Sequence, residues 1–164
     1  MLNKISLRFW YLGVAAACAA LLGFALWVQH RDFLDPCPLC IIQRLAFMWV
    51  GVFALLAALH NPARIGQRIY SWLLIIGSML GAGVSWWHVH LQGLPPDQVP
   101  ECGPGLNYML ENFPLLETLK SVFFASGSCA EIKWQFLGLS MPGWTLVWFV
   151  GLTVLTLYFT YRKA

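Results

Sequence analysis

Residues 37–59 read CPLCIIQRLAFMWVGVFALLAAL, and this stretch decides the fold. From Ile41 to Leu59 its single charged side chain is Arg44. A run of about 20 apolar residues spans a bilayer as a helix, because each residue advances the helix by about 1.5 Å and the hydrocarbon core is about 30 Å thick. The stretch therefore predicts a transmembrane helix with two cysteines at its start.

Three further apolar runs of similar length predict three more transmembrane helices, at about residues 9–28, 69–90 and 143–161. The chain has 164 residues, of which 59% are hydrophobic and 10% are charged, whereas a soluble domain carries about 25% charged residues. Four buried helices of a soluble protein would leave almost no chain to face water. We expect one all-α membrane domain over residues 1–164, a four-transmembrane-helix bundle.

The first apolar run follows Lys4 and Arg8, a charge pattern that secretory signal peptides share. Its apolar stretch is too long for a signal peptide, and we expect a retained helix. Lysine and arginine accumulate on the cytoplasmic side of membrane proteins. The residues that define this side are Lys4, Arg8, Arg64, Arg68, Arg162 and Lys163.

Both termini are then cytoplasmic, and the loops at about residues 29–40 and 91–142 face outward. All seven acidic residues also fall on the outer side, so the net charge of +3 is divided by the membrane and predicts no nucleic-acid partner. The long outer loop begins with residues 93–105, GLPPDQVPECGPG, where prolines and glycines exclude regular structure.

Two short helices are expected later in that loop. Residues 114–127, PLLETLKSVFFASG, form an amphipathic pattern that ends at a glycine. Residues 129–144, CAEIKWQFLGLSMPGW, place apolar side chains such as Ile132 and Phe136 opposite charged ones. That pattern is typical of a helix lying on the membrane surface, although a packed loop helix fits it equally well.

The Cys37-Pro38-Leu39-Cys40 motif is the sharpest chemical feature. Two cysteines three apart at a helix start can form a redox-active disulfide, and the helix N-terminus stabilises a thiolate. Half of a zinc site is a rival, but no second close pair of ligands follows, and we expect no metal. A c-type haem site requires histidine where Ile41 stands. A structural disulfide remains as the alternative.

Arg44 lies one helical turn after Cys40, on the same helix face. It is either an interfacial anchor whose side chain extends outward, or a cation that stabilises a thiolate at Cys40 or the charge on a lipid-soluble electron acceptor. His88 and His90 lie near the outer end of the third helix. Each is either a solvated interfacial residue or a hydrogen-bond and proton donor to such an acceptor.

Cys102 and Cys129 flank most of the long outer loop, and two cysteines on an oxidising face indicate a disulfide. Cys102 stands between Pro100 and Pro104, where another protein can reach it, and this favours an exchanging disulfide over a purely structural one. Cys18 lies among alanines in the middle of the first helix, and we interpret it as a packing residue.

The chain resembles the DsbB family of bacterial inner-membrane disulfide bond formation proteins. The resemblance covers nearly the whole chain: four helices, two outer cysteine pairs, the Cys37-x-x-Cys40-x3-Arg44 unit and residues 122–144, VFFASGSCAEIKWQFLGLSMPGW. It implies that the outer loops are periplasmic and that the chain is a quinone-dependent thiol oxidoreductase. Its partner would be a DsbA-like periplasmic dithiol oxidase, and its cofactor ubiquinone, or menaquinone without oxygen.

The resemblance also implies roles for individual residues. Reduced DsbA would attack a Cys102–Cys129 disulfide and form a mixed disulfide with Cys102. Released Cys129 would attack Cys37, and Cys40 would donate to the quinone with support from Arg44.

The family's histidine near the quinone corresponds to His88 in the sequence HVHLQ, although the alignment can shift to His90. Three rival readings remain. One is a non-catalytic tetraspan scaffold braced by disulfides. The others are a paralogue dedicated to another thiol partner and a four-helix oxidoreductase similar to vitamin K epoxide reductase.

Overall fold

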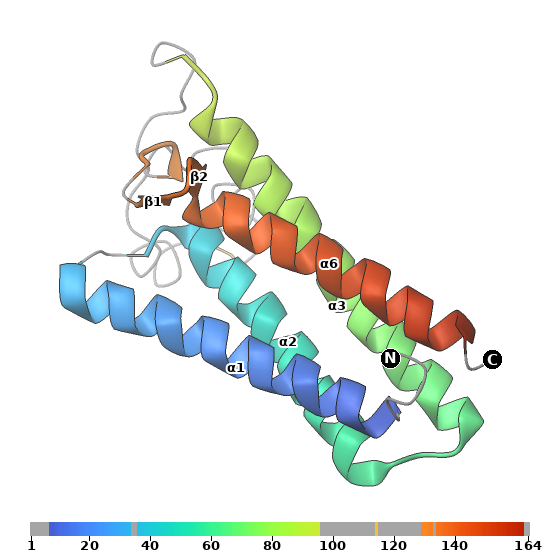
Figure 1. Cartoon of the computed structure of the whole chain (residues 1–164). Helices are drawn as coiled ribbons and strands as arrows, with labels where there is room; N and C mark the ends of the chain where they lie inside the picture. Colours follow the sequence, from blue (N-terminus) through green and yellow to red (C-terminus); the bar gives the residue numbers. More distant parts are fainter. Residues whose placement is uncertain (1–6, 34–35, 96–113, 115–128, 133, 163–164) are drawn as a thin grey trace.

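The computed structural model describes residues 7–33, 36–95, 114, 129–132 and 134–162. Within these ranges four helices are long and apolar enough to cross a membrane, which confirms the predicted four-helix membrane fold. A two-stranded antiparallel hairpin precedes the last helix (Figure 1). The elements are α1 (Leu7–Asp32), α2 (Pro38–His60), α3 (Arg64–Gln92), β1 (Gln135–Phe136), β2 (Leu139–Ser140) and α6 (Met141–Arg162).

All four helices extend beyond the uncharged runs that predicted them, and the largest extension is at the start of α3. The connection between α2 and α3 is short. Asn61 adopts a left-handed conformation with φ 40°, and its N–H donates to the Ala57 carbonyl, which ends α2. Helix α3 then begins at Arg64, because basic side chains at a membrane surface can extend outward while their backbone stays helical.

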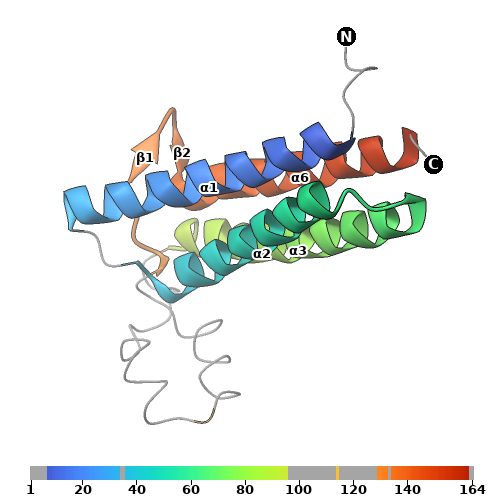
Figure 2. The same cartoon turned by 90° about the horizontal axis from the view of Figure 1, so that it is seen from below.

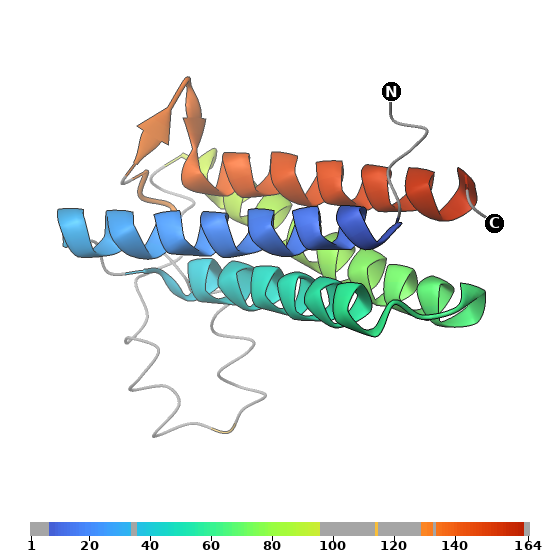
Figure 3. The ribbon, with the colours of Figure 1, turned by 60° about the horizontal axis from the view of Figure 1, so that its bottom comes forward.

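The helices pack in sequence order, with α1 against α2, α2 against α3, and α3 against α6 (Figure 1). The start of α1, the α2–α3 connection and the end of α6 lie at one end of the bundle, and the hairpin lies at the other (Figure 2). Figure 3 shows α1 alongside α2. Helices α1 and α6 meet where α1 begins and α6 ends, and there the rings of Trp10 and Phe159 stack with centroids 4.6 Å apart.

Two glycines of α3 allow the neighbouring helices to approach closely. A Cβ added at Gly77 would lie 2.5 Å from the ring of Trp49 in α2, and one added at Gly81 would lie 2.5 Å from the ring of Phe149 in α6. The two positions form the GxxxG spacing GSMLG, in which small residues let large side chains pack against the backbone. Cys18 is likewise buried, against Gly51.

Replacing Gly81 with alanine is expected to destabilise the bundle by about 1–3 kcal/mol, because the new methyl group overlaps the buried ring of Phe149. Thermal unfolding in detergent measures the effect. Gly83→Ala is the matched control, since a Cβ there meets no atom within 4 Å. Equal midpoints for the two variants would contradict the close contact between α3 and α6.

A hairpin lies before α6, where the sequence predicted a short helix. Residues Gln135 and Phe136 pair with Ser140 and Leu139. Leu137 and Gly138 both have positive φ, at 52° and 79°, which is the geometry of a two-residue hairpin turn. The expectation of a surface helix or a packed loop helix is therefore wrong over residues 135–140, because the turn at Gly138 reverses the chain.

The apolar side chains of this segment are nevertheless exposed, as the surface interpretation requires. Those with large exposed fractions are Ile132, Phe136, Leu137 and Leu139. The predicted amphipathic helix at residues 115–127 lies outside the described residues, as does most of the proline-rich arm, including Cys102.

Candidate active site

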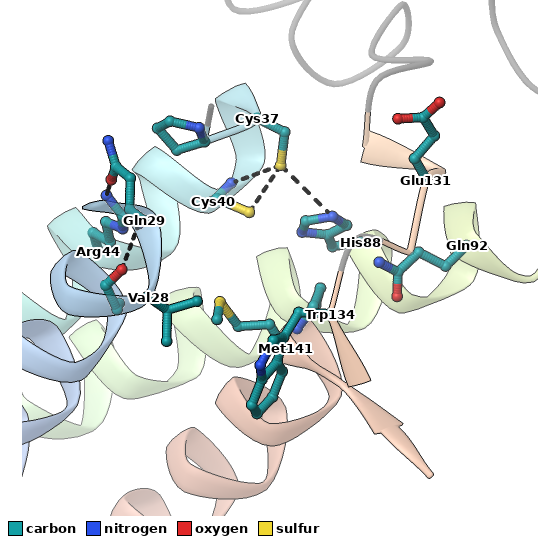
Figure 4. A pocket seen from close by; sticks show the side chains of 13 residues that line it. Val28, Gln29, Cys37, Cys40, Arg44, His88, Gln92, Glu131, Trp134 and Met141 are labelled. Atoms are coloured by element: carbon teal, nitrogen blue, oxygen red, sulfur yellow. Dashed lines mark hydrogen bonds between the residues drawn. The ribbon is translucent and has the colours of Figure 1, made fainter. Parts of the chain in front are cut away.

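Cys37 is the N-cap of α2, and its motif is folded as a helix start. The Cys37 sulfur accepts a hydrogen bond from the Cys40 backbone N–H at 3.4 Å, and Pro38 occupies the first helical position, where no N–H is required. The Cys37 thiol donates to the Cys40 sulfur at 2.8 Å (Figure 4). The motif thus holds its two sulfur atoms in contact at a helix N-terminus.

The two sulfurs are not equivalent. Cys40 receives a hydrogen bond from Cys37, and a donated hydrogen bond stabilises the thiolate form of the acceptor. The pKa of the Cys37 thiol is raised well above its ordinary value, because hydrogen bonds with Cys129 and Cys40 and burial all favour the protonated form. When the pair is reduced, negative charge is therefore favoured on Cys40 and the proton on Cys37.

Folding brings His88 and Cys129 to the same point. The Cys37 sulfur lies 3.7 Å from the His88 Nε2 atom, and that nitrogen lies 3.1 Å from the Cys129 carbonyl oxygen. The Cys129 sulfur is within 4.8 Å of both the Cys37 sulfur and a His88 ring nitrogen. Residues far apart in the sequence thus place the Cys129 sulfur beside the Cys37–Cys40 pair.

The structure distinguishes the two candidate histidines. His88 is 2% exposed and points toward Cys37 (Figure 4). His90 is exposed, with its ring against Trp86 and Trp87. The interpretation of a solvated interfacial residue therefore fits His90 and does not fit His88.

A buried polar network sets the orientation of the His88 ring. The Gln43 amide nitrogen lies 3.3 Å from His88 Nδ1, and the Thr145 hydroxyl donates to the Gln43 oxygen at 3.3 Å. With Nδ1 accepting from Gln43, the proton resides on Nε2, which faces the Cys129 carbonyl and the Cys37 sulfur. Gln43 and Thr145 were not predicted, although a glutamine in an apolar run is a visible signal.

Arg44 is fixed against α1. Its guanidinium donates to the Gln29 side-chain oxygen at 2.6 Å and to the Ala25 carbonyl at 3.5 Å (Figure 4). Sequence reasoning also missed Gln29, which follows the predicted end of the first helix. Because a hydrogen-bonded pair holds Arg44 beside the helix turn that contains Cys40, its charge stays near that sulfur.

Two adjoining cavities meet at Cys40 and Arg44. The larger one has a volume of about 440 Å³ and lies between α1, α2, α6 and the hairpin. Its walls are mostly apolar and aromatic, and its polar groups gather at one end. They come from Cys40, Gln43, Arg44 and Thr145.

The smaller cavity, of about 80 Å³, lies on the side of the cysteine motif. Cys37, His88 and Glu131 line it, together with Cys40 and Arg44 (Figure 4). Both cysteines of the motif therefore border the smaller cavity, and Cys40 also borders the larger, apolar one.

The chain is similar to known proteins over nearly its whole length. The family model described as "Disulfide bond formation protein DsbB" matches residues 7–159. A Chromobacterium violaceum protein named "Disulfide bond formation protein B" is 50% identical over 160 residues, covering 98% of this chain and 96% of its own length. A protein of the same name from Nitrosococcus oceani is 49% identical over 155 residues, covering 94% and 92%.

Both the family match and the relatives extend over nearly the whole length compared. The four apolar helices and the paired sulfurs at a helix N-terminus are what an oxidoreductase that forms disulfide bonds in a membrane requires. The chain therefore belongs to the DsbB family of disulfide bond formation proteins.

Proposed function

We propose that this chain reoxidises a DsbA-like periplasmic dithiol oxidase and passes the electrons to membrane ubiquinone, or to menaquinone without oxygen. One observation carries the proposal. The Cys37–Cys40 pair lies beside Cys129, and Cys40 and Arg44 border a 440 Å³ apolar cavity. A dithiol in this position can exchange with a thiol of the outer loop and deliver electrons to a lipid-soluble acceptor.

The proposed orientation places both termini in the cytoplasm and the cysteine loops in the periplasm, in the bacterial inner membrane. Its support is the distribution of basic residues. The start of α1, with Arg8, and the start of α3, with Arg64 and Arg68, lie at the end opposite the cysteine motif. The positive-inside rule then assigns the cysteine end to the outer face, where disulfides persist.

In the proposed first step, a thiolate of the reduced partner attacks a Cys102–Cys129 disulfide. A bond forms between the partner sulfur and Cys102, the bond to Cys129 breaks, and Cys129 leaves as a thiolate. The partner's second thiol then displaces Cys102, so that the partner leaves oxidised. Two electrons now reside on the outer cysteine pair.

In the second step, Cys129 attacks the Cys37–Cys40 disulfide at Cys37, and Cys40 leaves as a thiolate. The contact between Cys129 and Cys37 supports this choice of sulfur. The position of Cys40 at the N-terminus of α2, near Arg44, favours it as the leaving group, because a stabilised thiolate leaves faster. Closure of the outer pair then frees both Cys37 and Cys40 as the reduced dithiol.

The larger cavity fits a quinone ring. It is in the size range of small-molecule sites, its walls are apolar, and its few polar groups converge at one end. A bound quinone would supply a two-electron, two-proton acceptor. Arg44 would hold positive charge beside its oxygens, and Cys40 would present its sulfur at the cavity wall.

His88 stays a predicted member of the quinone site. Among the described contacts it touches the thiol side, through Cys37 and Cys129, and reaches the larger cavity through Gln43. Its ring can therefore pass a proton between the sulfurs and the polar end of that cavity.

The proposal predicts that purified protein reduces ubiquinone-1 when reduced DsbA is supplied. It also predicts that a DsbA variant with a single active-site cysteine becomes trapped as a mixed disulfide on Cys102. Non-reducing electrophoresis and peptide mapping identify the adduct, which Cys102→Ser should remove and Cys18→Ser should retain. A scaffold braced by inert disulfides would form no adduct and reduce no quinone.

A further inference from the structure

Four soft or nitrogen ligand atoms converge at the outer end of the bundle. Cys37, His88 and Cys129 each contribute one atom, and these atoms lie within 4.8 Å of one another. The Cys40 sulfur adds a fourth, 2.8 Å from that of Cys37. They come from three separate segments: the start of α2, the end of α3 and the turn before β1. The sequence spacing gave no indication of a metal site, because the cluster exists only in the fold.

The separations suit a tetrahedral cation. Zinc binds sulfur at about 2.3 Å and histidine nitrogen at about 2.0–2.1 Å, so adjacent ligand atoms lie about 3.5–3.8 Å apart. The Cys37 sulfur and His88 Nε2 are 3.7 Å apart. Three protein ligands with a water, or with Cys40 after its side chain rotates away from Cys37, complete four-coordination.

The surrounding groups also fit a ligand role for His88. Metal-binding histidines usually hydrogen-bond through their other ring nitrogen, which fixes the ring direction. Gln43 holds His88 Nδ1 in this way and leaves Nε2 facing the sulfurs. When Nε2 binds a cation, the ring proton moves to Nδ1. The Gln43 side chain can then turn its oxygen toward the ring and accept a hydrogen bond from Nδ1–H.

A route to the cluster is present. Cys37, Cys40 and His88 line the smaller cavity together with Glu131, whose side chain is exposed at its edge. A carboxylate beside this entry attracts cations.

We propose that the reduced form of this cluster binds a soft, redox-inert divalent cation such as Zn²⁺ or Cd²⁺. Each thiol that becomes a ligand releases its proton to water, and no electron moves. Disulfide formation removes the thiolate ligands, so the oxidised protein does not bind. The cation is an inhibitor that competes with disulfide exchange for the same sulfur atoms, and it is not a resident cofactor. Binding itself does not rest on the proposed relay, whereas inhibition does.

The test uses the full-length protein in detergent, which is reduced and then freed of reductant. This protein is titrated with Cd²⁺. A thiolate-to-cadmium ultraviolet charge-transfer band is expected to saturate, and the oxidised protein is expected to show none. Cys129→Ser and His88→Gln should each weaken the affinity at least about tenfold. Cys18→Ser and Cys102→Ser are the matched controls and should leave it unchanged.

Circular dichroism and gel filtration verify that the variants are folded, and Cys129→Ala provides a second substitution if Cys129→Ser is not. The proposal is overturned if Cys129→Ser or His88→Gln binds as tightly as the parent, if the oxidised protein binds, or if Cys102→Ser abolishes the band. A separate arm adds Zn²⁺ to the quinone assay, where inhibition should be reversed by a chelator. Cadmium binding by a protein without quinone activity would refute the proposed function and leave the cation site intact.

Discussion

Cys40→Ser is expected to abolish the reduction of ubiquinone-1 by reduced DsbA, with a loss of at least about a thousandfold in turnover. Cys40 is the sulfur that borders the 440 Å³ cavity and receives the Cys37 hydrogen bond, so the variant lacks the group proposed to deliver electrons. Serine occupies nearly the same volume and keeps the helix start intact. Absorbance of the quinone measures the rate under anaerobic conditions.

Cys18→Ser is the matched control, because Cys18 is a buried thiol of α1 that packs in the bundle core. It should retain turnover once folding is verified. The mixed disulfide with DsbA should still form in Cys40→Ser, since the first exchange uses the other cysteine pair. Full quinone reduction by Cys40→Ser would remove this sulfur from the electron path.

Arg44→His is expected to raise the apparent KM for ubiquinone-1 about tenfold, a loss of about 1.4 kcal/mol in binding, with a smaller decrease in kcat. Histidine is shorter and mostly neutral at pH 7, so it places less charge at the polar end of the cavity. Steady-state kinetics over a range of quinone concentrations separate the two constants.

Gln29→Leu tests how Arg44 is positioned. It removes the acceptor of the 2.6 Å hydrogen bond but keeps the guanidinium, so a smaller rise in KM in the same direction is expected. Arg44→Lys keeps the charge without the paired donors and should fall between the parent and Arg44→His. An unchanged KM in Arg44→His would exclude Arg44 from the quinone site.

The membrane fold follows from sequence because its physical cause is local. Length and apolarity decide whether a segment spans a bilayer, and all four runs predicted this way are helices. Their ends are less predictable. The uncharged run of α3 begins after Arg68, yet the helix begins at Arg64. Charged residues mark where the hydrocarbon core ends, but a helix can continue past that point.

The hairpin at residues 135–140 illustrates a different failure. The surface helix was predicted from residues 129–144, where apolar side chains stand opposite Glu131 and Lys133. The turn that overrides this pattern depends on Leu137 and Gly138, which have positive φ. A glycine between two leucines was the available signal, and hydrophobic periodicity outweighed it in the prediction.

In the functional site, too, contacts between residues close in the sequence were predictable, and contacts between distant residues were not. The Cys37–Cys40 motif and Arg44 lie within two helical turns, so their proximity is visible in the sequence. The contact of Cys129 with His88 depends on how the segment before β1 packs against the end of α3, and residue spacing in the sequence does not predict this. Gln29 and Gln43 acquire their roles only from partners on neighbouring helices.

The central claim is that Cys129 exchanges directly with Cys37, and a double variant tests it most directly. In Cys40→Ser/Cys102→Ser, Cys37 and Cys129 are the two remaining outer cysteines. After mild oxidation with diamide, non-reducing peptide mass spectrometry should find a Cys37–Cys129 disulfide in most molecules. The Cys102→Ser/Cys129→Ser variant, which keeps the Cys37–Cys40 pair, shows that the oxidation works. If that control oxidises while Cys37 and Cys129 both remain open to alkylation in the test variant, the account is wrong.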